Sequence, residues 1–172
     1  MFHIFRKKTS EPTKPIKIPQ HIAFICDGNR RWAEQRGLPP LMGHKAGLAS
    51  NSNMIDWFIA HGVSTVTFFI FSTENWSRSK EEVDFLMDLF YTVMKNNLEN
   101  LVTKNLRYRI VGSREGLPKK LAEICDKLED MSAENTGGTV VFALNYGGQD
   151  EIVRAVNSAI ENGQPVDKET FE

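Results

Sequence analysis

The stretch "HIAFICDGNRRWA", residues 21–33, changes character in its middle. Residues 21–26 are mostly apolar and rich in strand-forming types, which predicts a short buried strand. Asp27 and Gly28 follow directly, and glycine allows the backbone to turn sharply. From about Arg30 the pattern becomes helical. A buried strand that turns at once into a helix is typical of a parallel α/β sheet.

The rest of the chain repeats this alternation of strand and helix. Further strands are predicted at residues 64–71, 106–111 and 139–145. Helices are predicted from residue 30, over a second segment that ends at Gly62, and at residues 80–105, 118–131 and 150–161. We therefore expect an α/β fold: a mostly parallel sheet flanked by helices on both faces.

The helix predicted at residues 80–105 carries a wider apolar stripe than one contact needs. Phe85, Leu89 and Val93 lie beside the main apolar positions, which suggests two apolar neighbours. Glu81 and Glu82 are expected to stabilise the N-terminal turn of this helix.

Composition describes an ordinary globular chain. Its 172 residues are 41% hydrophobic and 25% charged, with a formal net charge of −1. Such a chain does not bind nucleic acid through bulk electrostatics, so phosphate recognition must come from a local site. Cys26 and Cys125 form no C-x-x-C pair, which fits a reduced cytoplasmic chain with two small core residues.

Residues 1–20 are predicted to form a flexible basic arm before a domain that covers residues 21–172. Five basic residues and three prolines stand there beside one acidic residue. We expect a disordered tail. The alternative is a transient membrane-surface contact, in which Phe2, Ile4, Phe5 and the basic residues bind anionic lipid.

Polar clusters follow three of the predicted strands. They are Asp27 with Gly28, the run Ser72-Thr73-Glu74-Asn75, and the run Asn145-Tyr146-Gly147-Gly148. Ligands of parallel sheets bind beyond the carboxyl ends of the strands, where the following helices present free N–H groups. Arg31 and Arg78 can add bidentate contacts to phosphate. The sequence therefore predicts a phosphate site at this edge of the sheet.

An aspartate at a phosphate site points to a divalent cation. Asp27 would repel phosphate unless such an ion lay between them, and one carboxylate with phosphate oxygens is a usual Mg²⁺ arrangement. The alternative is that Asp27 only caps the following helix. The sequence contains no G-x-G-x-x-G after a strand, no P-loop and no G-x-S-x-G elbow, which removes the main support for dinucleotide-binding, P-loop and serine hydrolase functions.

Four blocks of sequence hold most of these polar residues. The blocks are "HIAFICDGNRRWA" from His21, "GHKAG" from Gly43, "FSTENWSRSKEEV" from Phe71 and "NYGGQDEIVRA" from Asn145. In order and spacing they resemble the cis-prenyltransferase family, typified by undecaprenyl diphosphate synthase. The resemblance implies condensation of isopentenyl diphosphate with an allylic, farnesyl-type diphosphate into a cis-polyprenyl diphosphate. It also implies the family's α/β fold, a Mg²⁺ cofactor, a cytoplasmic homodimer, and an apolar tunnel beside the long helix.

By this resemblance, Asp27 holds Mg²⁺ and assists departure of the allylic diphosphate. The residues expected to bind that substrate and shape its pocket are Gly28, Asn29, Arg30, Arg31, Trp32, His44, Ser72, Thr73, Glu74, Trp76 and Arg78. Asn75 is the family's other candidate catalytic residue. Because a neutral amide is too weakly basic to remove a proton, we expect Asn75 to orient the substrate or a departing diphosphate that takes the proton itself.

The chain also departs from the family pattern. Pro40 stands where the family usually has an arginine, so one cation for the diphosphate is missing unless Arg36 compensates. Smaller departures are Ser52, Asn53, Ser79 and Gln149. The family continues beyond Glu172 with an arginine-, serine- and glutamate-containing block that binds isopentenyl diphosphate and metal. We therefore expect a sequence truncated before the last strands, which lacks the acceptor site and is inactive alone.

Two other functions stay open at this point. A non-catalytic partner subunit would bind an allylic or polyprenyl diphosphate without turnover. A Mg²⁺-dependent phosphohydrolase on a similar sheet would release inorganic phosphate or diphosphate without isopentenyl diphosphate.

Overall fold

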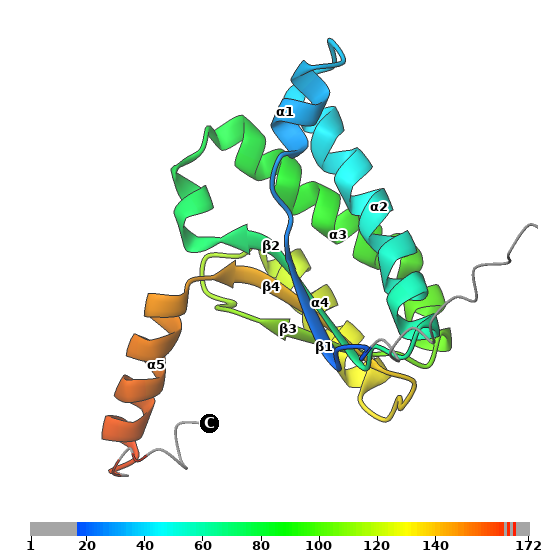
Figure 1. Ribbon diagram of the computed structural model, residues 1–172. Helices are drawn as coiled ribbons and strands as arrows, with labels where there is room; N and C mark the ends of the chain where they lie inside the picture. The colour runs from blue at the N-terminus through cyan, green and yellow to red at the C-terminus, as the bar shows by residue number, and fades with distance from the viewer. Residues whose placement is uncertain (1–16, 164, 166, 168–172) are drawn as a thin grey trace, which may run out of the picture.

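The computed structural model describes residues 17–163, 165 and 167 and contains a four-stranded sheet with helices packed on it (Figure 1). The elements in chain order are β1 (His21–Ile25), α1 (Asn29–Glu34), α2 (Pro40–Ala60), β2 (Thr65–Ser72), the short 3₁₀ helix η1 (Thr73–Ser77), α3 (Lys80–Thr103), β3 (Arg107–Val111), α4 (Lys119–Ser132), β4 (Thr139–Tyr146) and α5 (Gly148–Glu161). Residues 1–16, most of the predicted basic arm, lie outside the described residues.

The strands run in the order β1-β2-β4-β3, and every neighbouring pair is parallel. Thr65 of β2 lies opposite His21 of β1 on one side and Thr139 of β4 on the other. Because the strands are parallel and in this register, the carboxyl ends of β1, β2 and β4 meet at one edge. The predicted α/β fold and parallel sheet are confirmed.

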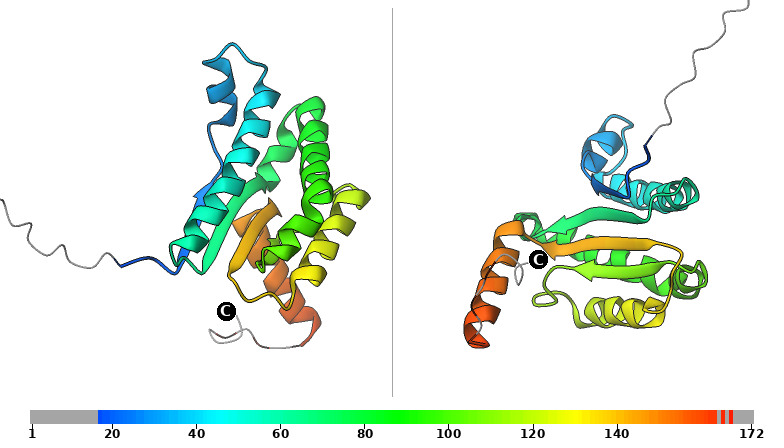
Figure 2. Two further views of the ribbon diagram at one scale, coloured as in Figure 1. Left: turned by 90° about the vertical axis from the view of Figure 1, so that its right-hand side faces the viewer. Right: turned by 60° about the horizontal axis from the view of Figure 1, so that its bottom comes forward.

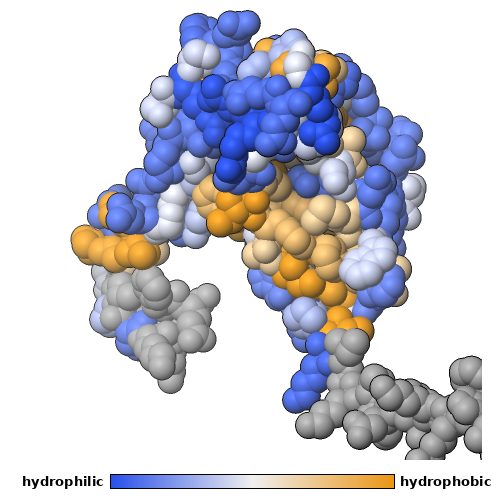
Figure 3. All heavy atoms as spheres, turned by 45° about the horizontal axis from the view of Figure 1, so that its top comes forward, coloured by the Kyte–Doolittle hydropathy of each residue, from blue (hydrophilic) through white to orange (hydrophobic). Residues whose placement is uncertain are grey.

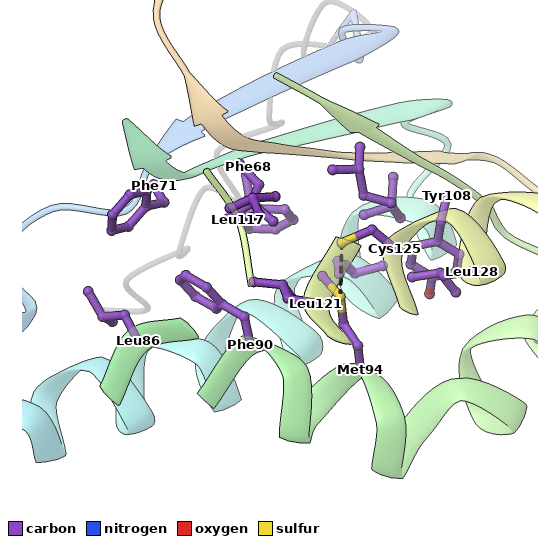
Figure 4. Packing of buried hydrophobic residues seen from close by; sticks show 14 of the residues in the cluster. Phe68, Phe71, Leu86, Phe90, Met94, Tyr108, Leu117, Leu121, Cys125 and Leu128 are labelled. Atoms are coloured by element: carbon purple, nitrogen blue, oxygen red, sulfur yellow. Dashed lines mark hydrogen bonds between the residues drawn. The ribbon is translucent and has the colours of Figure 1, made fainter. Parts of the chain in front are cut away.

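The hydrophobic core lies between one face of the sheet and three helices. Phe68 and Tyr108 point from β2 and β3 toward α3 and α4 and are fully buried (Figure 4). Phe24 of β1 packs against Phe58 of α2, with ring centroids 5.3 Å apart. Figure 2 shows α2, α3 and α4 side by side on this face.

The opposite face of the sheet is open in the described part of the chain. Ile25 of β1 is 81% exposed and Ala23 of the same strand is exposed, while Val111 is exposed on β3 at the opposite edge of the sheet. Helix α5 does not cover this face, because it leaves the end of β4 and projects from the sheet with no buried residue (Figure 2). Helices were expected on both faces; within the described residues they cover one.

The apolar stripe of α3 contacts the core and also lines a cavity. Leu86, Phe90 and Met94 point into the core, where Met94 approaches Cys125 of α4 (Figure 4). Leu89, together with Leu86 and Phe90, also lines a cavity between α3 and α2. In the part of the chain that the structure describes, no helix combines the length and apolar character needed to cross a membrane.

Candidate functional site

Two adjoining cavities open at the carboxyl ends of β1 and β2. The larger has a volume of about 450 Å³ and the smaller about 300 Å³. Polar residues of the larger cavity lie at the strand ends and nearby helix starts: Asp27, Asn29, His44, Ser72, Asn75 and Arg78. Residues farther along the strands and helices form the rest of its wall, which is mostly apolar with Ser50 and Asn51 among it; the apolar ones include Phe24, Leu48, Met54, Phe69, Leu89 and Phe90.

The smaller cavity adds cationic residues to the polar end. Gly28, Arg30 and Arg31 line it together with Asp27 and Asn29. On the molecular surface, a hydrophilic region over α1 adjoins a broad apolar area (Figure 3). The site is therefore amphiphilic, with charge at one end and an apolar wall at the other.

The turn between β1 and α1 shapes this polar end. Gly28 has φ +86°, a conformation that side chains other than glycine rarely adopt, and it occupies the N-cap position of α1. Asp27 is 77% exposed in its side chain, and its Oδ2 accepts a hydrogen bond from Arg31 at 3.0 Å. No side chain caps α1, so Asp27 does not act as the cap of this helix.

Two glycines of α2 let α1 approach closely. A Cβ at Gly43 would collide with the backbone carbonyl of Asn29, and one at Gly47 would collide with the Asn29 side chain. Since residues four apart share one face of a helix, these glycines form a smooth strip against which Asn29 packs. The motif "GHKAG" therefore fixes the position of Asn29 and carries His44 on the same turn.

The end of β2 holds Ser72 and Asn75. The register between β2 and β4 shifts twice near this end, so that consecutive residues Phe71 and Ser72 are both buried. Asn75 Oδ1 accepts a hydrogen bond from the Ser72 backbone N–H at 3.1 Å. The amide NH₂ of Asn75 is left for a ligand, since no acceptor for it occurs among the described residues.

Three predicted site residues lie near the cavities without lining them. Trp76 donates from its indole N–H to Asn145 Oδ1 at 2.7 Å, and its ring packs edge-on against Phe71. Thr73 and Glu74 share the η1 helix with Trp76, and none of the three belongs to the lining of either cavity.

Trp32 and Arg36 also lie outside both cavity linings. The Arg36 guanidinium lies 4.3 Å from the centre of the Trp32 ring and donates to the Trp32 carbonyl at 3.2 Å. Arg36 is therefore engaged elsewhere, and Pro40, the first residue of α2, brings no cation of its own.

Glu82 lies in the first turn of α3, as predicted, and also makes contacts that the sequence did not indicate. Ser79 caps the start of α3, because its Oγ accepts a hydrogen bond from the backbone N–H of Glu82. The Glu82 carboxylate, however, is only 11% exposed and contacts Arg30, His44 and Arg78. The Arg78–Glu82 spacing of four residues could have indicated one of these pairs. The other two come from α1 and α2, and no local pattern indicates them.

Burial lowers the pKa of the His44 imidazole from its ordinary value of 6.5. Its hydrogen bond and charge interaction with Glu82 act in the opposite direction, while Arg78 and Arg30 add to the lowering. The neutral imidazole is therefore favoured in the folded chain.

Asp27 is the carboxylate that lines both cavities. Among the described residues, no group of three or more His, Cys, Asp or Glu side chains could hold a metal ion. The donor set therefore does not suit a cation that needs a cage of protein ligands. It fits Mg²⁺, which is commonly bound by one or two carboxylates with phosphate oxygens and water as its other ligands.

Comparison with known proteins identifies the family. The family model described as "Putative undecaprenyl diphosphate synthase" matches residues 25–172. The chain belongs to this prenyltransferase family. The isoprenyl transferase of Thermotoga maritima is 42% identical to the chain over 161 residues, and that of Neisseria meningitidis serogroup B is 44% identical over 158 residues.

A solved structure of the family agrees with the fold. Lavandulyl diphosphate synthase from Lavandula x intermedia, in complex with dimethylallyl diphosphate, superposes with a TM-score of 0.84 at 31% identity, covering 90% of this chain and 69% of that one. The chain spans 69% of the length of the Thermotoga relative and 64% of the Neisseria relative, which cover 91% and 92% of this chain. The resemblance carried by the four sequence blocks is confirmed.

Proposed function

We propose that this chain binds an allylic diphosphate in the larger cavity and transfers its prenyl group to isopentenyl diphosphate, as an isoprenyl transferase forming a cis-polyprenyl diphosphate such as undecaprenyl diphosphate. The supporting observation is the amphiphilic pair of adjoining cavities, with cations and amides at one end and mostly aliphatic and aromatic side chains along the rest. A phosphorylated isoprenoid has the same division of chemistry.

The polar end would bind the diphosphate. Arg30, Arg31 and Arg78 supply guanidinium donors, which suit phosphate oxygens in bidentate geometry. Gly28 lets the backbone approach closely, and the first N–H groups of α1 have no acceptor within the helix. Asn29 and Ser72 complete the proposed binding group.

The reaction breaks the C–O bond between the allylic carbon and the diphosphate, whose oxygen keeps the electron pair. The double bond of isopentenyl diphosphate supplies the electrons of the new C–C bond, and the proton lost from the acceptor passes to the departing diphosphate. Arginines positioned at the diphosphate would stabilise the charge that develops there. The apolar wall would keep water from the allylic cation.

Asp27 would hold Mg²⁺ at the diphosphate. The ion would offset the negative charge of the leaving group, so that an exposed carboxylate and a diphosphate can lie near one another. Asn75 would orient the diphosphate through its amide NH₂, because its carbonyl oxygen already accepts from Ser72. Thr73, Glu74, Trp32 and Trp76 stay expected site residues on the strength of the resemblance.

Asp27→Ala is the direct test. Turnover of farnesyl diphosphate and isopentenyl diphosphate should fall by several orders of magnitude in a preparation that contains the acceptor site, while the thermal unfolding midpoint stays close to that of the unchanged protein because Asp27 is exposed. Unchanged turnover would refute the metal-holding role. Binding of farnesyl diphosphate with no turnover in any preparation would instead favour the partner-subunit alternative.

The family resemblance also supports a cytoplasmic homodimer as part of this proposal. Analytical ultracentrifugation and cell fractionation test these two points. The expectation that the acceptor site is missing from the chain stays a prediction.

A further inference from the structure

Glu82 is a buried carboxylate that contacts three cationic or titratable side chains from three different segments. Arg78 Nη1 lies 2.9 Å from its Oε1, His44 Nε2 lies 3.2 Å from the same oxygen, and Arg30 Nη1 lies 3.5 Å from Oε2. Carboxylates are rarely buried to this extent unless cations compensate them.

Glu82 does not line either cavity, so it is not placed to contact a ligand there. His44 and Arg78 line both cavities, and Arg30 lines the smaller one, whereas Glu82 lines neither. Glu82 therefore lies behind the three side chains that face the site. Arg30 is 53% exposed in its side chain and would otherwise move freely in solvent.

The contact with Glu82 also determines which nitrogen of His44 carries the proton. An ionised carboxylate only accepts hydrogen bonds, so a neutral His44 in this contact has its proton on Nε2. Nδ1 is then an acceptor and has no hydrogen to donate to a phosphate oxygen. Protonation of His44 would give it that donor, while Nε2 keeps its bond to Glu82.

We infer that Glu82 is a positioning residue that holds Arg30, His44 and Arg78 together as one diphosphate-binding group and couples diphosphate binding to protonation of His44. This inference rests on the proposed function, because it takes the diphosphate to bind at these cavities. The charged groups that face His44 are Glu82 from α3, Arg78 from the segment before α3, and Arg30 from α1.

The test compares Glu82→Gln with Glu81→Gln. Glu81 lies on the same turn of α3 but is exposed, and the described structure contains no ion pair to it, so its variant is a matched control. Calorimetric titration with metal-free inorganic diphosphate, in two buffers of different ionisation enthalpy, measures both affinity and proton uptake. Any proton taken up by the diphosphate itself is measured equally with Glu81→Gln, so the difference between the two variants comes from the protein.

Glu82→Gln should weaken diphosphate binding about tenfold or more, as expected for losing charge-assisted positioning contacts. It should also reduce proton uptake below that of Glu81→Gln, because the glutamine carries no charge to favour a protonated His44. Equal or tighter binding with unchanged proton uptake would overturn the inference and leave the proposed function intact. If the unchanged protein binds neither inorganic nor farnesyl diphosphate, the proposed function itself fails.

A second measurement uses the unchanged protein, in case Glu82→Gln does not fold. Nitrogen NMR of the imidazoles should show His44 protonated at Nε2, with its titration midpoint rising when inorganic diphosphate is added. His61, which bonds to the Trp57 carbonyl at the far end of α2, should not respond. A His44 that carries its proton on Nδ1, or that ignores the diphosphate, would overturn the inference.

Discussion

Gly43 has no room for a side chain, because a Cβ there would collide with the Asn29 carbonyl. Gly43→Ala should lower the free energy of unfolding by about 1–3 kcal/mol, the usual cost of overpacking a close contact. Gly148→Ala is the control, since a Cβ at that position of α5 meets nothing within 4 Å. Urea unfolding followed by circular dichroism measures both, and equal midpoints would contradict the close packing of α1 on α2.

At residue 40, the chain has a proline where its family usually has an arginine. Pro40→Arg should tighten binding of farnesyl diphosphate by about 1 kcal/mol, the size of one added charge-assisted contact. Pro40→Gln controls for loss of the proline ring. Arg36 stacks on Trp32 and lines neither cavity, so we do not expect it to supply the missing cation. Unchanged affinity in a titration would show that Arg36 compensates after all.

His44 gives the stability of the fold a defined pH dependence. Burial lowers its pKa below the ordinary 6.5, so between that lower value and 6.5 the unfolded chain binds more protons than the folded chain. Stability should be lost as pH falls through this window and be fully present above it. His44→Gln should reduce the difference between the urea unfolding midpoints at pH 7.5 and pH 5.5 more than His61→Gln does. An equal reduction in both variants would contradict the assignment of this pH dependence to His44.

At the scale of elements, one buried polar residue of β4 connects η1 with another segment that is distant in sequence. Asn145, at the end of β4, is 4% exposed and accepts from Trp76 of η1. Its own NH₂ donates to the carbonyls of Ser113 and Glu115 in the loop after β3. One side chain thus connects three segments beside the site. The backbone of Asn145 also has a positive φ of 52°, which asparagine tolerates better than most residues.

Asn145→Ala should therefore destabilise the fold by about 2 kcal/mol or more, because it leaves buried partners unsatisfied and places alanine at a positive φ. It should also change the fluorescence of Trp76. Trp76→Phe separates the two effects, since it removes one hydrogen bond of Asn145 and keeps the others. An Asn145→Ala protein with unaltered stability would contradict the connecting role.

The regular elements could be predicted from sequence, and the irregular ones could not. The strand that contains Phe68 is apolar on both faces, and the helix that contains Phe90 has near-helical apolar spacing, so local pattern was sufficient for both. The η1 helix is a single short 3₁₀ segment without an apolar period. The direction of α5 also lies beyond local pattern, because its apolar stripe indicates a helix but not what the helix packs against.

For the whole molecule, the edge of the sheet that holds the site was predictable because parallel topology brings strand ends together. Asp27 and Ser72 meet there although they lie far apart in sequence. The depth of the site was not predictable, since Glu82 reaches its partners through the packing of α1, α2 and α3. The sequence therefore indicated many of the side chains that line the cavities, but it did not indicate that Glu82 lies behind them.

The strand order has a consequence for how the protein is made. β4 is the last strand of the described chain to be synthesised, yet it lies between β2 and β3. Until β4 leaves the ribosome, β2 can pair only with β1, and β3 has no strand beside it. Contacts between such distant segments form slowly. A nascent chain would thus present the apolar strand around Phe68 to chaperones throughout translation of α3, β3 and α4.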